Sequence, residues 1–515
     1  MQPPIIKFLG HAGFLLTYNN TKLLCDPWLS ESGAFLHSWH QFPPNDFIDK
    51  SELYDANFIY LSHNHFDHFD KEFLKKFPKE KVTIIIANFL SDFFYNEIKD
   101  LGFSHILRLE DWEEQVLGED FSVTLIKDPS LYKIDSVAII KAGGKTVVDK
   151  NDCNLPQTYY QRIQEMDVDI LFAQFSGAMW YPAAYDYDEA AQRQHATRIK
   201  RNLQNNFIAI ANGIEAKHVM HCAGPPCFLE DKFFKFNFRE NGIFPDQKDA
   251  FEYLANNIVG KLHLLLPGDI ITPDGDDILQ RQRTFDFSRK EEFLRQHQEK
   301  KKKIIQSYLA GLPKPEPNLM QHFREHLQGI FSSNEHIRNK VNALIKFTLV
   351  GPNGGSICLD LREQRDDFSV DSAEKPNYEF ILETTIAQLL VDEKERWEDV
   401  FLSMRFQARR NPDVYNWPLF ALLQFGKEAN LIARIEQMMK ENEKETIIIR
   451  DKGKQYRIQR YCPHAGEDLS KAKIVNGKIV CPRHHWTFDL NCGGKCIFGG
   501  NMPLKIYEEK EEEAV

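Results

Sequence analysis

The 515-residue sequence lacks several features that would assign it to common classes of protein. It has no window of eighteen uninterrupted apolar residues, so we expect no membrane-spanning segment. The start, Met1 to Phe8, lacks a basic region followed by a long apolar stretch, which argues against a secretory signal peptide. The net charge of −11 argues against a nucleic-acid partner, because such proteins usually carry a clustered basic excess. These absences favour a cytoplasmic protein.

Cysteine is also scarce, with nine residues in the whole chain. In a protein of the reducing cytoplasm, cysteines ligate metals more often than they form disulfides. No G-x-G-x-x-G fingerprint follows a predicted strand, so we expect any nicotinamide cofactor to bind to another protein.

The chain is too long for one hydrophobic core, and its pattern predicts four parts. Residues 1–265 alternate short apolar strands with helical stretches, which predicts a layered α/β domain. Residues 266–317 read as a helical linker that ends in a proline-rich run. Residues 318–440 read as mixed and mostly helical, and residues 441–515 as short strands with a hairpin turn at Asn476-Gly477. The prediction is a multidomain α/β plus all-β protein.

Two short cysteine–histidine motifs lie in the last part. Cys462 and His464 form the first, and Cys481 and His484 form the second, each between predicted strands. Two thiolates on one iron and two imidazoles on the other are the ligands of a Rieske [2Fe–2S] cluster. Zinc accepts the same donors, but zinc-finger spacing places a histidine pair on a helix after the cysteines, and that pair is absent. We therefore predict that these four residues hold a Rieske cluster.

This segment resembles the Rieske ferredoxin and oxygenase domain over its whole length. Respiratory Rieske proteins carry an additional cysteine in each cluster loop, whereas residues 465–467 and 483–485 contain none. The resemblance therefore implies the lower-potential type of cluster that supplies electrons to an oxygenase. Cys492 and Cys496 lie further on, and they are either a second metal site or ordinary turn residues.

An H-x-H-x-D-H motif runs from His63 to His68, directly after the apolar strand 58–61. Three imidazoles and one carboxylate on a single turn can bind two neighbouring metal ions.

The motif resembles that of the metallo-β-lactamase superfamily, which binds one or two metals at the open edge of a four-layer αββα sandwich. Gly10–Gly13 and Asp26–Trp28, after the first two strands, fit the same pattern. The resemblance implies that Asp152 bridges two metals and that His221 is the last histidine ligand. The implied ligands are His63, His65, Asp67, His68, Asp152 and His221.

The segment 128–135 departs from the superfamily pattern, because it lacks the histidine usually supplied to the first metal. That site is short of a ligand unless Asp128 or Tyr132 substitutes. The second site keeps two imidazoles and a carboxylate, which is the ligand set of non-haem Fe(II) oxygenases.

Most of the chain resembles the CMP-N-acetylneuraminate hydroxylase family, iron enzymes that combine Rieske and metallo-β-lactamase-like domains. The similar stretches are Cys25–Leu29, Ile59–His68, Asp152–Pro156, Phe175–Ala178 and Phe406–Tyr415. In that family the Rieske domain comes first, whereas here it comes last. The reaction class therefore transfers better than the substrate.

The resemblance implies an iron-dependent monooxygenase with one or two non-haem iron ions. Electrons from NAD(P)H would come through a separate reductase or small electron carrier, and O₂ would be the oxidant. The substrate would be a small molecule, either a CMP-sialic-acid-like N-acetyl sugar or an amine or amino-acid derivative. An amino-acid derivative would resemble the substrate of the di-iron hydroxylase of chloramphenicol biosynthesis.

Two other functions stay open at this point. One is a metal-dependent hydrolase with an accessory Rieske domain, and the other is an electron-transfer or redox-sensing protein whose first domain only binds a ligand. Two segments also allow two interpretations each. The aromatic run 179–187 lines a substrate pocket or packs in the core, and the arginines at 405, 409 and 410 bind phosphate or form surface ion pairs.

Overall fold

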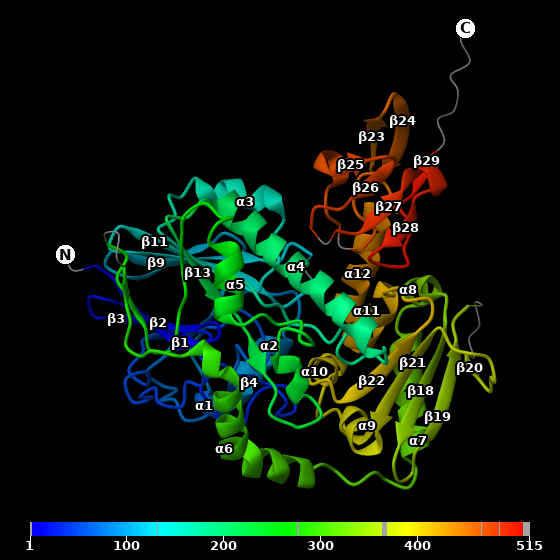
Figure 1. The fold of residues 1–515 in the computed structure, drawn as a ribbon, viewed down its shortest axis with the longest axis horizontal. Coiled ribbons are helices and arrows are strands. Elements are labelled where there is room, and N and C mark those ends of the chain that lie inside the picture. The colour runs from blue at the N-terminus through cyan, green and yellow to red at the C-terminus, as the bar shows by residue number, and fades with distance from the viewer. Residues whose placement is uncertain are drawn as a thin grey trace. The chain divides into compact units, whose positions relative to one another are not determined.

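The computed structural model describes residues 3–130, 132–274, 278–362, 368–464, 466–483 and 485–507. The chain forms two compact units (Figure 1). The first unit contains Met1–Pro129, Ile134–Leu312 and Asp399–Met404. The second unit contains Ser130–Lys133, Pro313–Glu398 and Arg405–Val515.

Two large sheets form the first unit. The first sheet has the strand order β17-β16-β1-β2-β3-β5-β6-β7, with bounds Leu279–Gln280, Ile270–Ile271, Ile5–Gly10, Gly13–Tyr18, Thr21–Cys25, Phe58–Tyr60, Thr83–Ala87 and Ile106–Leu109. The second has the order β15-β13-β12-β11-β10-β9-β8, with bounds Lys261–His263, His218–Cys222, Ile170–Gln174, Lys145–Asn151, Ser136–Ala142, Phe121–Lys127 and Glu114–Gly118. A small additional pair joins β4 (His40–Gln41) to β14 (Pro226–Cys227).

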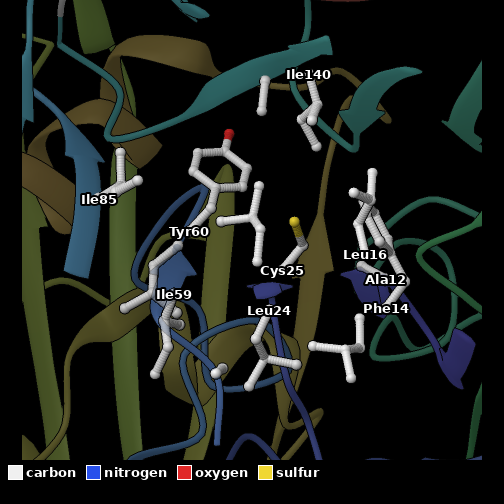
Figure 2. Close-up of a cluster of buried hydrophobic side chains, with 14 of the residues drawn as sticks. Ala12, Phe14, Leu16, Leu24, Cys25, Ile59, Tyr60, Ile85 and Ile140 are labelled. Carbon is white, nitrogen blue, oxygen red and sulfur yellow. The ribbon is translucent and has the colours of Figure 1, made fainter. Parts of the chain in front are cut away.

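The main core lies between the two sheets. Phe14 of β2 stacks on Phe172 of β12 at 4.7 Å between ring centroids, and both side chains are fully buried. Figure 2 shows part of this core, where Cys25 and Tyr60 of the first sheet point towards Ile140 of the second. Leu24 and Ile59 lie on the opposite face of the first sheet. Large apolar side chains from both sheets therefore exclude water from the interface, which is the main stabilising contribution.

Helices cover the outer faces of both sheets. The first sheet packs against α1 (Lys71–Leu74) and α2 (Phe93–Asp100) through buried residues such as Phe73 and Phe94. The second packs against α3 (Gln157–Gln164), α4 (Glu189–Ile214) and α5 (Gln247–Leu254) in a separate cluster. The four layers confirm the predicted αββα sandwich.

The linker prediction for 266–317 needs a correction. Its first part forms the short strands β16 and β17, and the helix α6 spans only Lys290–Ala310. β16 joins the edge of the first sheet, where Ile271 lies opposite Ile6. The charged composition of the segment indicates a helix, but backbone pairing to an existing sheet edge outweighs helix propensity over so short a stretch.

The second unit begins with a mixed region. Its five-stranded sheet has the order β20-β19-β18-β21-β22, with bounds Ser369–Val370, Gly355–Asp360, Leu344–Val350, Tyr378–Glu383 and Phe406–Arg410. The helices between residues 319 and 442 are α7 (Leu319–Ser332), α8 (Glu335–Val341), α9 (Thr384–Val391), α10 (Trp397–Leu402), α11 (Trp417–Phe425) and α12 (Ala429–Asn442), and residues 399–402 of α10 belong to the first unit.

Two small antiparallel sheets follow. One has the order β23-β24-β29 (Thr446–Asp451, Lys454–Gln459, Ile506–Tyr507), and the other β25-β26-β27-β28 (Lys473–Val475, Lys478–Val480, Thr487–Asp489, Lys495–Phe498). The predicted hairpin at Asn476-Gly477 is confirmed, because β25 pairs with β26 and both turn residues have positive φ. Among the helices within the described residues, none is long and apolar enough to cross a membrane.

Candidate metal centres

The loop after β5 carries the histidine motif, and Asp26 holds this loop in place. Asp26 directly follows β3, the strand that pairs in parallel with β5. Its Oδ1 accepts the Ser62 backbone N–H at 2.8 Å, and its Oδ2 accepts the Ser62 hydroxyl at 2.5 Å. The same Oδ2 lies 2.8 Å from His68 Nδ1. Asp26 therefore fixes the His68 ring so that Nε2 is the nitrogen left for a metal, a common arrangement around metal-binding histidines.

Two groups of donor atoms form around this loop. His63, His65 and Asp152 make the first group, and within each group the candidate ligand atoms lie within 4.8 Å of one another. His11, Asp67 and His68 make the second group.

Asp152 lies between the two groups. Its Oδ1 is 3.7 Å from His63 Nδ1 and 3.5 Å from His68 Nε2. The structure thus brings together five of the six residues proposed from the sequence, and Asp152 lies close to one histidine of each group.

The electrostatics of these groups favour a bound cation. Burial lowers the pKa of His63 well below its usual value, so its ring is a neutral donor. Burial would raise the pKa of Asp152, but His63 and His68 lower it to about 2. Burial would likewise lower the pKa of His68, but Asp152 and Asp26 raise it well above its usual value. The buried carboxylates thus favour positive charge among them, which a bound metal ion would supply.

Several of the donor atoms have no hydrogen-bond partner. Asp67 Oδ1, Asp152 Oδ1 and His68 Nε2 are buried without one. Such atoms are rare in proteins, because desolvating them costs free energy unless something replaces water. The ligand atoms of each group also lie within 4.8 Å of one another, so the residues present fit one or two metal ions.

His11 is the site residue that the sequence analysis did not assign as a ligand. It follows β1 in a left-handed conformation with φ of 52°, and its Nε2 lies 2.9 Å from Asp67 Oδ2. Its ring is 5.4 Å from that of His68 and 5.1 Å from that of Trp28. The sequence shows only that a histidine follows the first strand. That this strand lies near β3 and β5 becomes known only from the strand order of the sheet.

His221 belongs to neither group. It lies in β13, where burial lowers its pKa to about 3, and its Nε2 accepts the Leu265 N–H at 2.8 Å. An accepting Nε2 places the ring proton of a neutral imidazole on Nδ1. In this arrangement neither nitrogen offers a lone pair to a metal, and the ligand role of His221 stays a prediction.

The segment 128–135, which lacks the histidine expected from the superfamily, places an aspartate next to the first donor group instead. Asp135 Oδ1 lies 3.7 Å from His63 Nδ1, as close as Asp152. Tyr132 instead contacts the rings of Trp417 and Phe425, at 6.3 and 5.6 Å between centroids. Asp135 is therefore the residue of this segment that lies next to the first donor group.

The two Cys–His loops of the second unit share one backbone pattern. In each, the cysteine N–H donates to the carbonyl five residues later, and the cysteine carbonyl accepts the N–H four residues later. The partners are Glu467 and Gly466 for Cys462, and Trp486 and His485 for Cys481. Both cysteines are fully buried.

The side chains of these loops fit a cluster. Burial lowers the pKa of His464 to about 3, so this ring is the neutral imidazole that ligation requires. His484 lies outside the described residues. All nine cysteines are within the described part of the chain, and none of them forms a disulfide. Cys492 and Cys496 belong to neither of the candidate metal groups found among the described residues.

The arginines near residue 409 and the aromatic run 179–187, which each allowed two interpretations from the sequence, have contacts that favour one of them. Arg410 pairs with Asp413 at 2.6 Å and Arg409 with Glu379 at 3.2 Å, which favours ion pairs over a phosphate clamp. Trp180 packs on Phe401 at 4.9 Å and joins a buried aromatic cluster that includes Phe35. Phe35 in turn contacts the ring of His65 at 5.7 Å, so this cluster adjoins the first donor group.

Comparison with known families supports the assignment of each part. Residues 5–200 match a beta-lactamase superfamily domain, and residues 426–508 match a Rieske [2Fe-2S] domain. Residues 319–441 match an Rv3818-like, SCP2-like domain, which the sequence analysis did not foresee. The chain therefore combines a metallo-β-lactamase-like domain with a C-terminal Rieske domain.

Relatives share this combination to different extents. A protein of Mycolicibacterium smegmatis that is named for its Rieske 2Fe-2S centre is 26% identical over 96% of this chain and 97% of its own. The cytidine monophosphate-N-acetylneuraminic acid hydroxylase of Mus musculus is 24% identical over 50% of this chain and 44% of its own. CmlA, a diiron beta-hydroxylase from Streptomyces venezuelae, is 16% identical with a TM-score of 0.34, over 51% of this chain and 53% of its own.

Proposed function

We propose that this protein is a Rieske-dependent non-haem iron monooxygenase that hydroxylates or oxygenates a small molecule. The observation that supports the proposal most is the pair of donor groups around Asp152 in a chain that also has a Rieske domain. Iron bound at the two groups would supply the reduction of O₂ and the transfer of one oxygen atom into a C–H bond.

The Rieske domain favours iron over zinc at this edge. Zinc has no redox chemistry, so a zinc hydrolase would have no use for an electron-carrying cluster in the same chain. The similarity to a hydroxylase across half of the chain supports the same choice. A hydrolase with an accessory Rieske domain is the alternative that the test below separates.

The chain's own residues have distinct tasks in this proposal. His63, His65 and Asp152 would hold one ion, and His11, Asp67 and His68 the other, with Asp152 shared between them. Asp26 would keep the His68 ring in its orientation through the hydrogen bond at Nδ1. The aromatic cluster beside His65 would exclude water from one side of the site.

The electron source in this proposal is a separate protein. No dinucleotide fingerprint is present, so NAD(P)H would reduce an external reductase or small carrier that then reduces the cluster. Residues 426–508, which match the Rieske domain, carry fifteen lysines and arginines and ten acidic residues, in a chain whose net charge is −11. An acidic carrier would therefore be attracted to the Rieske domain.

The names of two relatives suggest which substrates to examine. The hydroxylase of Mus musculus is named for a CMP-linked N-acetyl sugar acid, and CmlA for β-hydroxylation. We propose a CMP-sialic-acid-like N-acetyl sugar or an amine or amino-acid derivative as the first substrates to examine.

A single-turnover reaction tests the reaction class. Protein reduced beforehand is mixed with candidate substrates and exposed to ¹⁸O₂, and the product is examined by mass spectrometry. The proposal predicts one labelled oxygen atom in the product and loss of the reduced-cluster EPR signal. Turnover without O₂ or donor, with oxygen taken from water, would assign the protein to the hydrolases instead.

A further inference from the structure

Two tryptophans enclose the cluster ligand His464. The indole of Trp486 stacks on the imidazole with 4.4 Å between centroids and 10° between planes. Trp417 meets the same ring edge-on, at 5.9 Å and 87°. One imidazole of the predicted ligand set is thus covered on two sides by apolar rings.

Trp486 connects the two cluster loops. Its backbone carbonyl accepts the N–H of Cys481 in the second loop, while its side chain lies on His464 of the first. A Cβ atom at Gly499 or Gly500 would approach the indole to 2.4 or 2.0 Å, so only glycine fits behind it. The indole is therefore held between the imidazole and the glycine backbone.

Trp417 comes from outside the Rieske sheets, from the first turn of α11 in the SCP2-like region. Asn416 caps this helix by accepting the Leu419 N–H, and its amide also donates to the Val341 carbonyl at 2.7 Å. The ring of Tyr132 contacts Trp417 at 6.3 Å, and Trp417 is 6% exposed. The helix start and its packing leave this side chain little freedom.

We propose that Trp417 is a positioning residue through which the SCP2-like region sets the reduction potential of the Rieske cluster. Two thiolates and two neutral imidazoles balance the charge of the oxidised cluster, so one-electron reduction leaves one net negative charge. Water near the ligands stabilises that charge, and rings that exclude water destabilise it. Solvent exposure is one of the established determinants of such potentials. The two indoles thus keep the potential low, as electron delivery to an oxygen-activating site requires.

The inference rests on the proposed function only in taking the cluster as an electron carrier. The potential is measured without turnover, so its test is independent of the ¹⁸O₂ result. A failure of the oxygenase proposal would leave this inference standing, and the reverse also holds.

The test is a dithionite titration of the full-length holoprotein, followed by the EPR signal of the reduced cluster. Trp417→Ala should raise the midpoint potential, with about a tenfold larger equilibrium constant for reduction, or about 59 mV for one electron. Trp417→Phe keeps an aromatic ring and should stay near the wild type. Trp397→Ala is the matched control, because Trp397 is as buried (3% exposed) but donates to His326 instead of contacting His464.

Two results would overturn the inference. The first is an unchanged potential in Trp417→Ala with full cluster content, and the second is an equal shift in the Trp397→Ala control. If Trp417→Ala does not retain the cluster, Trp417→Leu is titrated in its place, since it keeps an apolar side chain at the position. Loss of the cluster from both variants would show that Trp417 acts in folding, which also contradicts the inference.

Discussion

At the scale of single residues, the site depends on side chains that local spacing does not connect. The H-x-H-x-D-H motif was evident because its donors lie on one turn, whereas His11 is 52 positions before His63. Asp26 and His11 both have positive φ just after a strand, so each side chain turns abruptly into the site. Which strands are neighbours decides such contacts, and one sequence contains no direct record of that order.

The choice between His11 and His221 as the sixth ligand gives a prediction at this scale. His11→Ala should lose about one of the two edge iron ions, because His11 faces Asp67 at 2.9 Å. His221→Ala should keep both, because its Nε2 is occupied by the Leu265 N–H. The measurement is iron per chain after anaerobic reconstitution, and the intact cluster absorption serves as the folding control. Loss of iron from His221→Ala alone would restore the ligand set predicted from the sequence.

At the scale of elements, strands with long apolar runs were predicted well and short ones were not. The runs 58–61, 146–148 and 217–220 became β5, β11 and β13, which are strands of the two central sheets. The two-residue strands β16 and β17 were read as helix, because two residues give no periodicity from which to predict a strand. The five-stranded sheet of the SCP2-like region was likewise hidden by the strong helical pattern of its neighbours.

Two ionisable side chains, His297 and Lys301, lie on the buried face of helix α6. Its buried residues are Leu294, His297, Lys301 and Ile305, so two ionisable side chains lie between two apolar ones. His297 Nδ1 is buried without a hydrogen-bond partner, and its ring lies 6.0 Å from that of His40. Burial, followed by the charge of Lys301, lowers the pKa of His297 to about 4. Asp46 opposes this shift.

This pair predicts a pH-dependent stability of the first unit. A histidine whose pKa falls from about 6.5 unfolded to about 4 folded binds more protons when unfolded. The contribution of neutral His297 to the free energy of unfolding should therefore be fully present above pH 6.5. It should be lost progressively as the pH falls towards 4, by up to about 3 kcal/mol. His297→Leu should lose less stability than the wild type between pH 7.5 and pH 5.

Thermal melts followed by circular dichroism at the two pH values would measure the difference. His105→Leu is the matched control, because His105 is exposed and should leave the pH dependence unchanged. Equal pH dependence in the wild type and in His297→Leu would refute the assignment.

At the scale of the whole molecule, the combination of domains carries the functional argument. Both end domains were predicted from four-ligand and six-ligand motifs, because metal sites need fixed donor types at fixed spacings. The SCP2-like region has no such motif, so its fold and its contact with His464 came only from the structure. Substrate identity has no comparable signature in the sequence, since it depends on the shape of a pocket.

The central claim is that the metallo-β-lactamase-like edge holds redox-active iron supplied with electrons by the cluster. The most direct measurement is the metal content of anaerobically purified protein, combined with EPR after reduction by dithionite. Our account predicts three to four iron ions per chain (two in the cluster and one or two at the edge), with little zinc and a Rieske-type signal. Two iron ions in the cluster with stoichiometric zinc at the edge would contradict it.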